Sequence, residues 1–224
     1  ARTRRYHVEL STMFGMLVQG YVVSLQIFLL TLLGAVPLGV IVALGRLSKF
    51  RPLSFLTGLY ISLMRGTPLM LQMFAVFFIP YYVFGQQTGP SYMFVAVMIA
   101  FIVNYAAYFA EIYRSGIQSM PQGQYEAAQV LGYSRSQTFF GIILPQVFKR
   151  ILPAMGNEVV TLVKDTSLAF SIGIAEMFTT SRALVASQRN MAPFALAALI
   201  YWVTCLLIEF ALRRAEKGLD YYHD

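Results

Sequence analysis

Charged side chains are scarce in this 224-residue sequence, where Asp, Glu, Lys and Arg together make up 12% of the residues. Soluble domains carry about a quarter, and the mean hydropathy is +0.62, so an ordinary soluble domain is excluded. No charge occurs in residues 10–45, 66–110 or 190–208. Since a membrane-spanning helix needs about 20 apolar residues, the first stretch predicts one span, the second two and the third one.

Residues that carry chemistry are equally rare. The single cysteine, Cys205, lies in the last apolar run and is expected to pack among apolar neighbours. The two histidines, His7 and His223, lie near the two ends, which argues against a His-based triad or a clustered metal site. No Gly-Lys-Ser/Thr phosphate-binding loop is present. We therefore expect no catalytic residue, metal or cofactor in this chain, and any energy must come from a partner.

The net charge of +7 does not indicate nucleic-acid binding, because that requires a basic patch on a soluble face. Here the basic residues lie in short segments that flank the apolar runs, which is typical of topology determinants. Their distribution predicts an N-terminus outside the membrane and a cytoplasmic C-terminus. Arg2, Arg4 and Arg5 argue against this orientation.

We predict an all-α integral membrane protein that forms a single domain over residues 1–224. Its five expected spans cover about 17–44, 56–84, 92–118, 154–174 and 193–212. Within the second span, Gly66 and Pro68 are expected to loosen the helix locally. Glu176 to Ala192 is expected to be a polar connection.

A polar loop at about 120–145 interrupts this apolar pattern. Gln124 to Leu131 is expected to form a short helix that Gly132 ends in a left-handed conformation. A second amphipathic piece, Ser134 to Leu144, is expected to follow and to stop at Pro145. Two short helices at the mouth of a membrane bundle would suit a groove on another protein.

Polar residues recur on one helical face in two of the spans. On the third span they are spaced four, three and four apart: Asn104, Tyr108, Glu111 and Ser115. On the fourth they are spaced three and four apart: Glu158, Thr161 and Asp165. A charge at mid-bilayer costs about 2.5–3.5 kcal/mol on insertion scales, so such residues usually face the bundle interior. Together they would line a cleft for the ammonium group of an amino acid or for a basic side chain.

These residues could instead have a purely structural role as partners in ion pairs. Glu111 and Arg114 are three residues apart, so they can pair with each other. Lys164 and Asp165 can pair with groups on neighbouring helices.

The loop carries a spaced pattern: Glu126-Ala127-Ala128, three residues, Gly132, nine residues, then Ile142-x-Leu144-Pro145. This pattern resembles the signature of the membrane subunits of binding-protein-dependent ABC importers. Further segments resemble the polar amino acid branch, which handles histidine, arginine, lysine, glutamine and glutamate. They are Arg65 to Leu69, Tyr108 to Arg114, Ser119 to Gln124, Leu144 to Gln146 and Lys164 to Leu168. The match covers about residues 17–214.

The resemblance implies a subunit like those of type I ABC importers, in a prokaryotic inner or plasma membrane. It would pair with a second permease, identical or homologous, and receive an amino acid from an external binding protein. Two ATP-binding subunits, which hold ATP and Mg, would dock on the loop residues Tyr125, Glu126, Ala127, Ala128, Leu131 and Gly132. These patterns are shared across the branch and do not identify the amino acid.

The intramembrane carboxylates leave a competing function open. Glu111, Glu158 and Asp165 could form the path of an ion- or proton-coupled carrier or channel. A carrier needs no ATPase, so a separate ATP-binding chain that co-purifies would distinguish the two. For a membrane-embedded enzyme, no nucleophile or metal set is visible.

Overall fold

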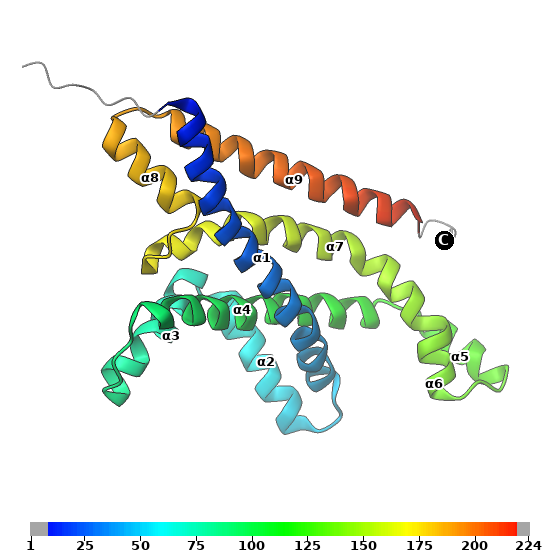
Figure 1. Cartoon of the computed structure of the whole chain (residues 1–224). Helices are drawn as coiled ribbons and strands as arrows, with labels where there is room; N and C mark the ends of the chain where they lie inside the picture. Colours follow the sequence, from blue (N-terminus) through cyan, green and yellow to red (C-terminus); the bar gives the residue numbers. More distant parts are fainter. Residues whose placement is uncertain (1–8, 219–224) are drawn as a thin grey trace, which may run out of the picture.

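The computed structural model describes residues 9–218, in which every regular element is helical (Figure 1). Three helices are long and apolar enough to cross a membrane: α1 (Leu10–Leu47), α4 (Pro90–Gln118) and α9 (Ala192–Gly218). Two bent helix pairs also qualify when each is counted as one span. The predicted all-α fold with about five spans is therefore confirmed. His7, His223 and the N-terminal arginines lie outside the described residues.

The second span is broken and not merely loosened. α2 (Arg51–Gly66) and α3 (Leu69–Phe84) meet at 109°. Pro68 disfavours helical backbone in the residue before it, and Thr67 is extended, with φ −124° and ψ 148°. The Gln72 side-chain amide donates to the Met64 carbonyl oxygen at 3.0 Å and to the Thr67 carbonyl oxygen at 3.1 Å. The freed backbone groups are thus partnered inside the protein, as a broken membrane helix requires.

The prediction that the second loop helix stops at Pro145 is wrong. A short α6 (Arg135–Thr138) runs through a π-helical turn, Phe139–Ile143, directly into α7 (Leu144–Asp165). Proline is tolerated in the first turn of a helix, because its missing N–H would have no intrahelical partner there. The widened π-helical turn before it makes this continuation possible. The fourth span therefore begins earlier than predicted, and α7 ends in a 3₁₀ helix, Thr166–Ile172.

The predicted polar connection after residue 176 is also wrong, because most of it is helix α8 (Met177–Gln188). Glu176 caps this helix and is fully buried. Its carboxylate accepts from the backbone N–H of Phe178 at 2.7 Å and of Thr179 at 2.6 Å. A charged residue that looks like a loop residue in the sequence is here the N-cap of a helix packed on α1 and α9. The preceding helical segment and α8 meet at 60°.

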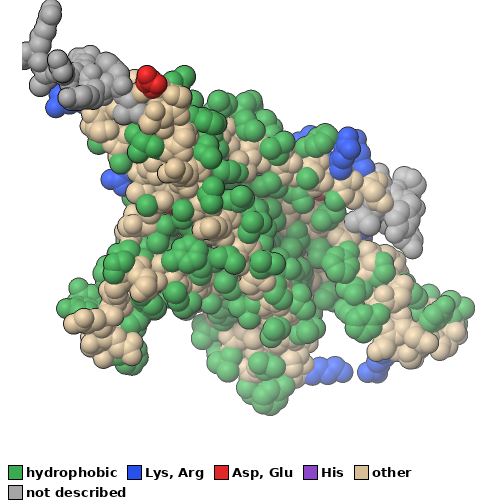
Figure 2. Space-filling view, in the orientation of Figure 1, with side chains coloured by type: hydrophobic (Ala, Val, Ile, Leu, Met, Phe, Trp, Pro, Cys, Tyr) green, Lys and Arg blue, Asp and Glu red, His purple; other side chains and the backbone are tan. Residues whose placement is uncertain are grey.

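Helix α1 crosses the molecule and packs along α4 (Figure 1). Its buried face is rich in small residues: Gly20, Ser24, Thr31, Ala35, Gly39 and Ala43. In lipid, helices associate by close packing, and small side chains let the backbones approach. A Cβ added at Gly39 would lie 2.9 Å from the Phe109 Cβ and 3.2 Å from the Ala106 carbonyl oxygen. Large apolar side chains cover much of the visible surface (Figure 2), as expected for contact with lipid. Cys205 packs against the main apolar core, as predicted.

We expect Gly20→Ala to separate α1 from α8. The added Cβ would lie 2.8 Å from the Met177 Cα, and a backbone atom cannot rotate away. Such overpacking costs about 1–3 kcal/mol, so the thermal unfolding temperature in detergent should fall. Gly15→Ala is the matched control, because nothing lies within 4 Å of its added Cβ. Equal melting temperatures for the two variants would contradict this account of the α1–α8 contact.

Candidate functional site

Helix α5 (Gln122–Val130) lies at the far end of α7, beside α6 (Figure 1). Gly132 follows it with φ +82°, which confirms the predicted left-handed conformation. The Gly132 N–H donates to the Gln129 carbonyl oxygen, and the Tyr133 N–H donates to the Ala128 carbonyl oxygen, both at 3.0 Å. These two bonds form a Schellman motif, in which glycine is the favoured residue at the left-handed position. The end of α5 is therefore fixed by its own sequence.

Side-chain contacts join α5 to α7. The Gln124 and Gln146 amides form reciprocal hydrogen bonds of 2.8 and 2.7 Å. Tyr125 is half-buried against a core cluster that includes Ile143 and Val147, and burial raises the pKa of its hydroxyl. Ala128 is buried as well. This short helix is thus positioned to move together with α7.

The opposite side of α5 is open. Glu126 and Ala127 are exposed, and Val130 and Leu131 are 87% and 74% exposed. Two large apolar side chains so exposed, next to a rigid turn, indicate a surface for another protein. This geometry agrees with a docking role for the predicted loop residues Glu126, Ala127, Leu131 and Gly132, a role that stays a prediction. Of the other two residues predicted to dock, Tyr125 is half-buried against the core cluster and Ala128 is buried, so neither is presented on the open side of α5.

The structure separates the four polar residues predicted on the third span, now α4. Asn104 is buried, and its amide donates to the Met64 carbonyl oxygen at 3.0 Å and to Gln72 Oε1 at 2.9 Å. It therefore closes the break between α2 and α3. Ser115 is exposed and donates to the Ile112 carbonyl oxygen of its own helix at 3.1 Å.

Tyr108 and Glu111 both meet Arg65, at the end of α2. The Arg65 guanidinium lies over the Tyr108 ring, 5.4 Å from its centroid, and 3.9 Å from a Glu111 oxygen. Glu111 also accepts from Arg114 Nε at 2.9 Å, so the expected Glu111–Arg114 pair is present. The charges on this face thus form a partly exposed network of mixed sign.

On the fourth span, now α7, Asp165 contacts α4 directly. The Tyr105 hydroxyl donates to Asp165 Oδ2 at 2.7 Å. Glu158 is half-buried and lies within electrostatic range of both Arg65 and Asp165. Thr161 is exposed and bonds only to the Asn157 carbonyl oxygen, at 2.9 Å, among the contacts of the described chain.

The structure thus gathers six side chains from α2, α4 and α7 in one polar region: Arg65, Tyr105, Tyr108, Glu111, Glu158 and Asp165. Two of its members, Arg65 and Tyr105, were not among the predicted site residues. The sequence could have indicated Arg65 as a site residue, because Arg65 directly precedes the Gly-Thr-Pro break. No sequence pattern indicated Tyr105, since it lies one residue away from the predicted polar face. Within residues 9–218, no cluster of three His, Cys, Asp or Glu side chains could hold a metal ion.

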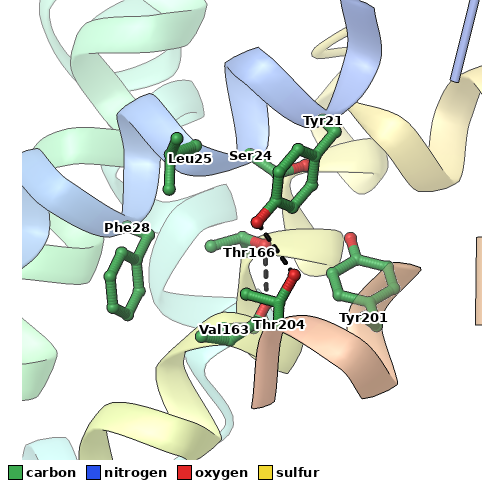
Figure 3. Close-up of a pocket in the computed structure, with 8 residues that line it drawn as sticks. All are labelled: Tyr21, Ser24, Leu25, Phe28, Val163, Thr166, Tyr201 and Thr204. Atoms are coloured by element: carbon green, nitrogen blue, oxygen red, sulfur yellow. Dashed lines mark hydrogen bonds between the residues drawn. The ribbon is translucent and has the colours of Figure 1, made fainter. Parts of the chain in front are cut away.

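A second group of polar side chains surrounds Glu176, which the sequence analysis missed. The Ser24 and Tyr201 hydroxyls each lie 3.4 Å from its Oε2. These hydroxyls also line a small pocket of about 10 Å³ between α1, α7 and α9 (Figure 3). At one side of the pocket, the Tyr21 hydroxyl and the Thr204 hydroxyl are hydrogen-bonded at 2.8 Å (Figure 3). A pocket of this size holds one water molecule at most, so this group is structural.

The protein has membrane-spanning helices, a protruding and partly apolar short helix, and a polar region between its spans. Together these features are typical of a membrane transport subunit. Residues 35–221 match the family described as the inner membrane component of binding-protein-dependent transport systems. The chain belongs to this family, which confirms the family predicted from the loop pattern.

Relatives and solved structures agree. The L-cystine transport system permease protein TcyB of Bacillus subtilis is 36% identical, with 91% of this chain and 86% of the relative covered. The arginine transport system permease protein ArtQ of the same organism is 34% identical, with 91% and 92% covered. A crystal structure of an amino acid ABC transporter with histidines superposes with a TM-score of 0.84 at 30% identity, over 95% of this chain and 99% of that one. A structure of the MetNI methionine transporter, at 17% identity and TM-score 0.74, supports the fold alone.

Proposed function

We propose that this chain is the permease subunit of an ABC importer that moves a polar amino acid, with a basic one favoured, into the cell. The observation that carries the proposal is the polar region between the spans, in which Glu158 lies within electrostatic range of both Arg65 and Asp165, and Asp165 accepts from the Tyr105 hydroxyl. Two carboxylates suit an ammonium group, and a guanidinium suits a carboxylate. Relatives named for the transport of arginine, glutamine and cystine support an amino acid as the substrate.

The chain would act as one membrane domain, with residues 120–145 as its coupling loop. Two ATP-binding subunits, which hold the ATP and Mg, would dock on the exposed side of α5. A second permease, the same chain or a close homologue, would complete the pathway, and an extracytoplasmic binding protein would deliver the amino acid. The proposed orientation in the prokaryotic cell membrane places the N-terminus outside, and α5 and the C-terminus in the cytoplasm.

The link between the two sites would run through α7. The Gln124–Gln146 amide pair joins α5 to the start of α7, and Asp165 is the last residue of this helix. Closure of the ATPase pair would draw the α5 helices together, and α7 would carry this motion to the polar region. Alternating access follows if the region opens outward in the closed state of the ATPases. The family membership favours this importer over an ion- or proton-coupled carrier or channel.

The test is ATPase activity and uptake by the reconstituted complex in liposomes. The external binding protein is supplied empty or loaded with arginine, histidine, lysine, glutamine or glutamate. Stimulation by one class of amino acid, together with its uptake, would identify the substrate. Substrate flux with no associated ATPase would overturn the proposal and favour a carrier.

Neutralising Asp165 should reduce uptake more than it reduces stability. Asp165→Asn keeps an acceptor for the Tyr105 hydroxyl but removes the charge proposed to attract the ammonium group. A lost charged hydrogen bond costs about 1.5–3 kcal/mol, which predicts a fall in uptake of about 10- to 150-fold. Glu209→Gln on α9 is the control, because this residue pairs with Arg213 away from the polar region. Unchanged uptake in Asp165→Asn, with uptake in the control also unchanged, would remove Asp165 from the site.

A further inference from the structure

An apolar groove opens between α1, α4 and the start of α7, away from the polar region. Its volume is 380 Å³, within the range of about 300–1,000 Å³ that is typical of ligand sites. Three segments form its walls. Its lining includes Val36, Val40 and Leu44 from α1, Ile117 from α4, and Phe140 and Phe148 from the α6–α7 segment. The groove therefore lies at the end of the bundle that also carries α5.

The lining of the groove offers only hydrocarbon to an occupant. Tyr113 is its single residue with a polar side chain, and this hydroxyl is directed to the Val36 carbonyl oxygen at 3.5 Å. Val40 and Phe140 remain 44% and 64% exposed. A groove of this chemistry between membrane spans suits an extended acyl chain, which needs no hydrogen-bonding partner.

Basic residues flank two of the groove-lining segments in the sequence. Lys49 and Arg51 follow Leu44 within seven residues, in the turn between α1 and α2, and Arg135 precedes the lining residue Phe139 by one helical turn. All three are exposed, and no ion pair within residues 9–218 engages them. Figure 2 shows Lys and Arg side chains on the middle and right-hand lower lobes of the molecule, on either side of the hollow between these two lobes.

Acidic residues do not balance these charges locally. The sequence has no Asp or Glu between Glu9 and Glu111, so the whole α1–α2 turn is positive. Basic groups between spans at the membrane surface attract anionic lipid headgroups, at about 1 kcal/mol for each Lys or Arg. The apolar groove with basic residues at its edge thus matches both the acyl chain and the headgroup of an anionic lipid.

We propose that the groove binds an anionic phospholipid, with one acyl chain between α1 and α7 and its headgroup against Lys49, Arg51 and Arg135. Lipid binding in this groove would not depend on the transported substrate or on the ATPase. Bound lipid would fill the space between α1 and the π-helical turn that joins α6 to α7, so it would stiffen this connection.

Native mass spectrometry of the solubilised protein, purified with the subunits that accompany it, tests the proposal. The probes are phosphatidylglycerol and phosphatidylcholine with identical acyl chains. We expect tighter binding of phosphatidylglycerol. Lys49→Gln with Arg51→Gln should weaken phosphatidylglycerol binding about thirtyfold, which is the loss expected for two basic residues. Arg213→Gln with Arg214→Gln, which removes the same charge from α9, should leave it unchanged.

A second pair of variants tests the acyl-chain site without a change in charge. Val40→Trp fills the groove and should reduce the binding of both lipids, whereas Val22→Trp places the same side chain on the same helix at a similar exposure of 48%. Equal affinity for the two lipids, or an equal effect of the two tryptophan variants on lipid binding, would overturn the proposal. Either result would show that the bound lipid is only non-specific annular lipid. Loss of a second permease chain in Val40→Trp, with lipid retained, would instead assign the groove to a protein contact.

Discussion

Gly132→Val is expected to uncouple ATP hydrolysis from uptake. The glycine has φ +82°, a conformation that costs an L-residue about 1–2 kcal/mol, and a β-branched side chain fits it least well. To avoid this strain the turn must give up the Schellman bonds that end α5, and the exposed Val130 and Leu131 would then move. A strain of this size changes an equilibrium about 5- to 30-fold, so uptake per ATP hydrolysed should fall by about tenfold. Uptake and ATPase activity measured in the same liposomes give this ratio.

The matched control is Gly123→Val, in the first turn of the same helix. Gly123 has no positive φ, and nothing lies within 4 Å of its added Cβ. Delivery by the binding protein should be unaffected in both variants, because α5 is remote from the proposed external face. A normal ratio of uptake to hydrolysis in Gly132→Val would show that α5 does not transmit the motion.

Glu176→Leu is expected to prevent stable folding. The leucine removes the acceptor for two backbone N–H groups at the start of α8, and each buried donor left unsatisfied costs about 1–3 kcal/mol. The Ser24 and Tyr201 hydroxyls lose an acceptor as well. A total of about 2–6 kcal/mol is comparable with the whole stability of many domains. Low yield and a reduced unfolding temperature in detergent are the expected results.

Glu176→Gln separates this capping role from the simple loss of a charge. The glutamine keeps one side-chain oxygen that can accept from the α8 N–H groups, so it should lose less stability than leucine. Glu209→Leu controls for the removal of a carboxylate elsewhere, since Glu209 is only partly buried and, among the described residues, forms an ion pair only with Arg213. A Glu176→Leu protein with the melting temperature of the wild type would show that α8 does not need this cap.

Hydropathy predicted the spans well because a membrane excludes charge along the whole length of a helix, whatever its neighbours are. The uncharged stretches 10–45, 66–110 and 190–208 all fall largely within helices. The end of α5 was predictable for a similarly local reason, since the left-handed conformation at Gly132 favours glycine through its own backbone. The spaced loop pattern likewise sufficed to predict the family.

The errors arose where a neighbour in space decides the outcome. Pro145 was expected to end a helix, but the π-helical turn before it lets the chain continue into α7. Glu176 was assigned to a polar connection, yet Ser24 and Tyr201 from two other helices enclose it. A local sequence window contains none of these partners.

In the candidate site, too, the local sequence predicted some features and contacts between helices decided the others. Periodicity placed Asn104, Tyr108, Glu111 and Ser115 on one face of α4, and this spacing is a property of any helix. The rotation of α4 against its neighbours then directed Asn104 to the α2–α3 break and left Tyr105, one residue on, to meet Asp165. The sequence by itself determined the membrane helices, the family and the short exposed helix, since each depends on local backbone preference or on transfer into lipid. Only the tertiary structure decided which polar groups meet, because a hydrogen bond requires two helices to be fixed in distance and rotation.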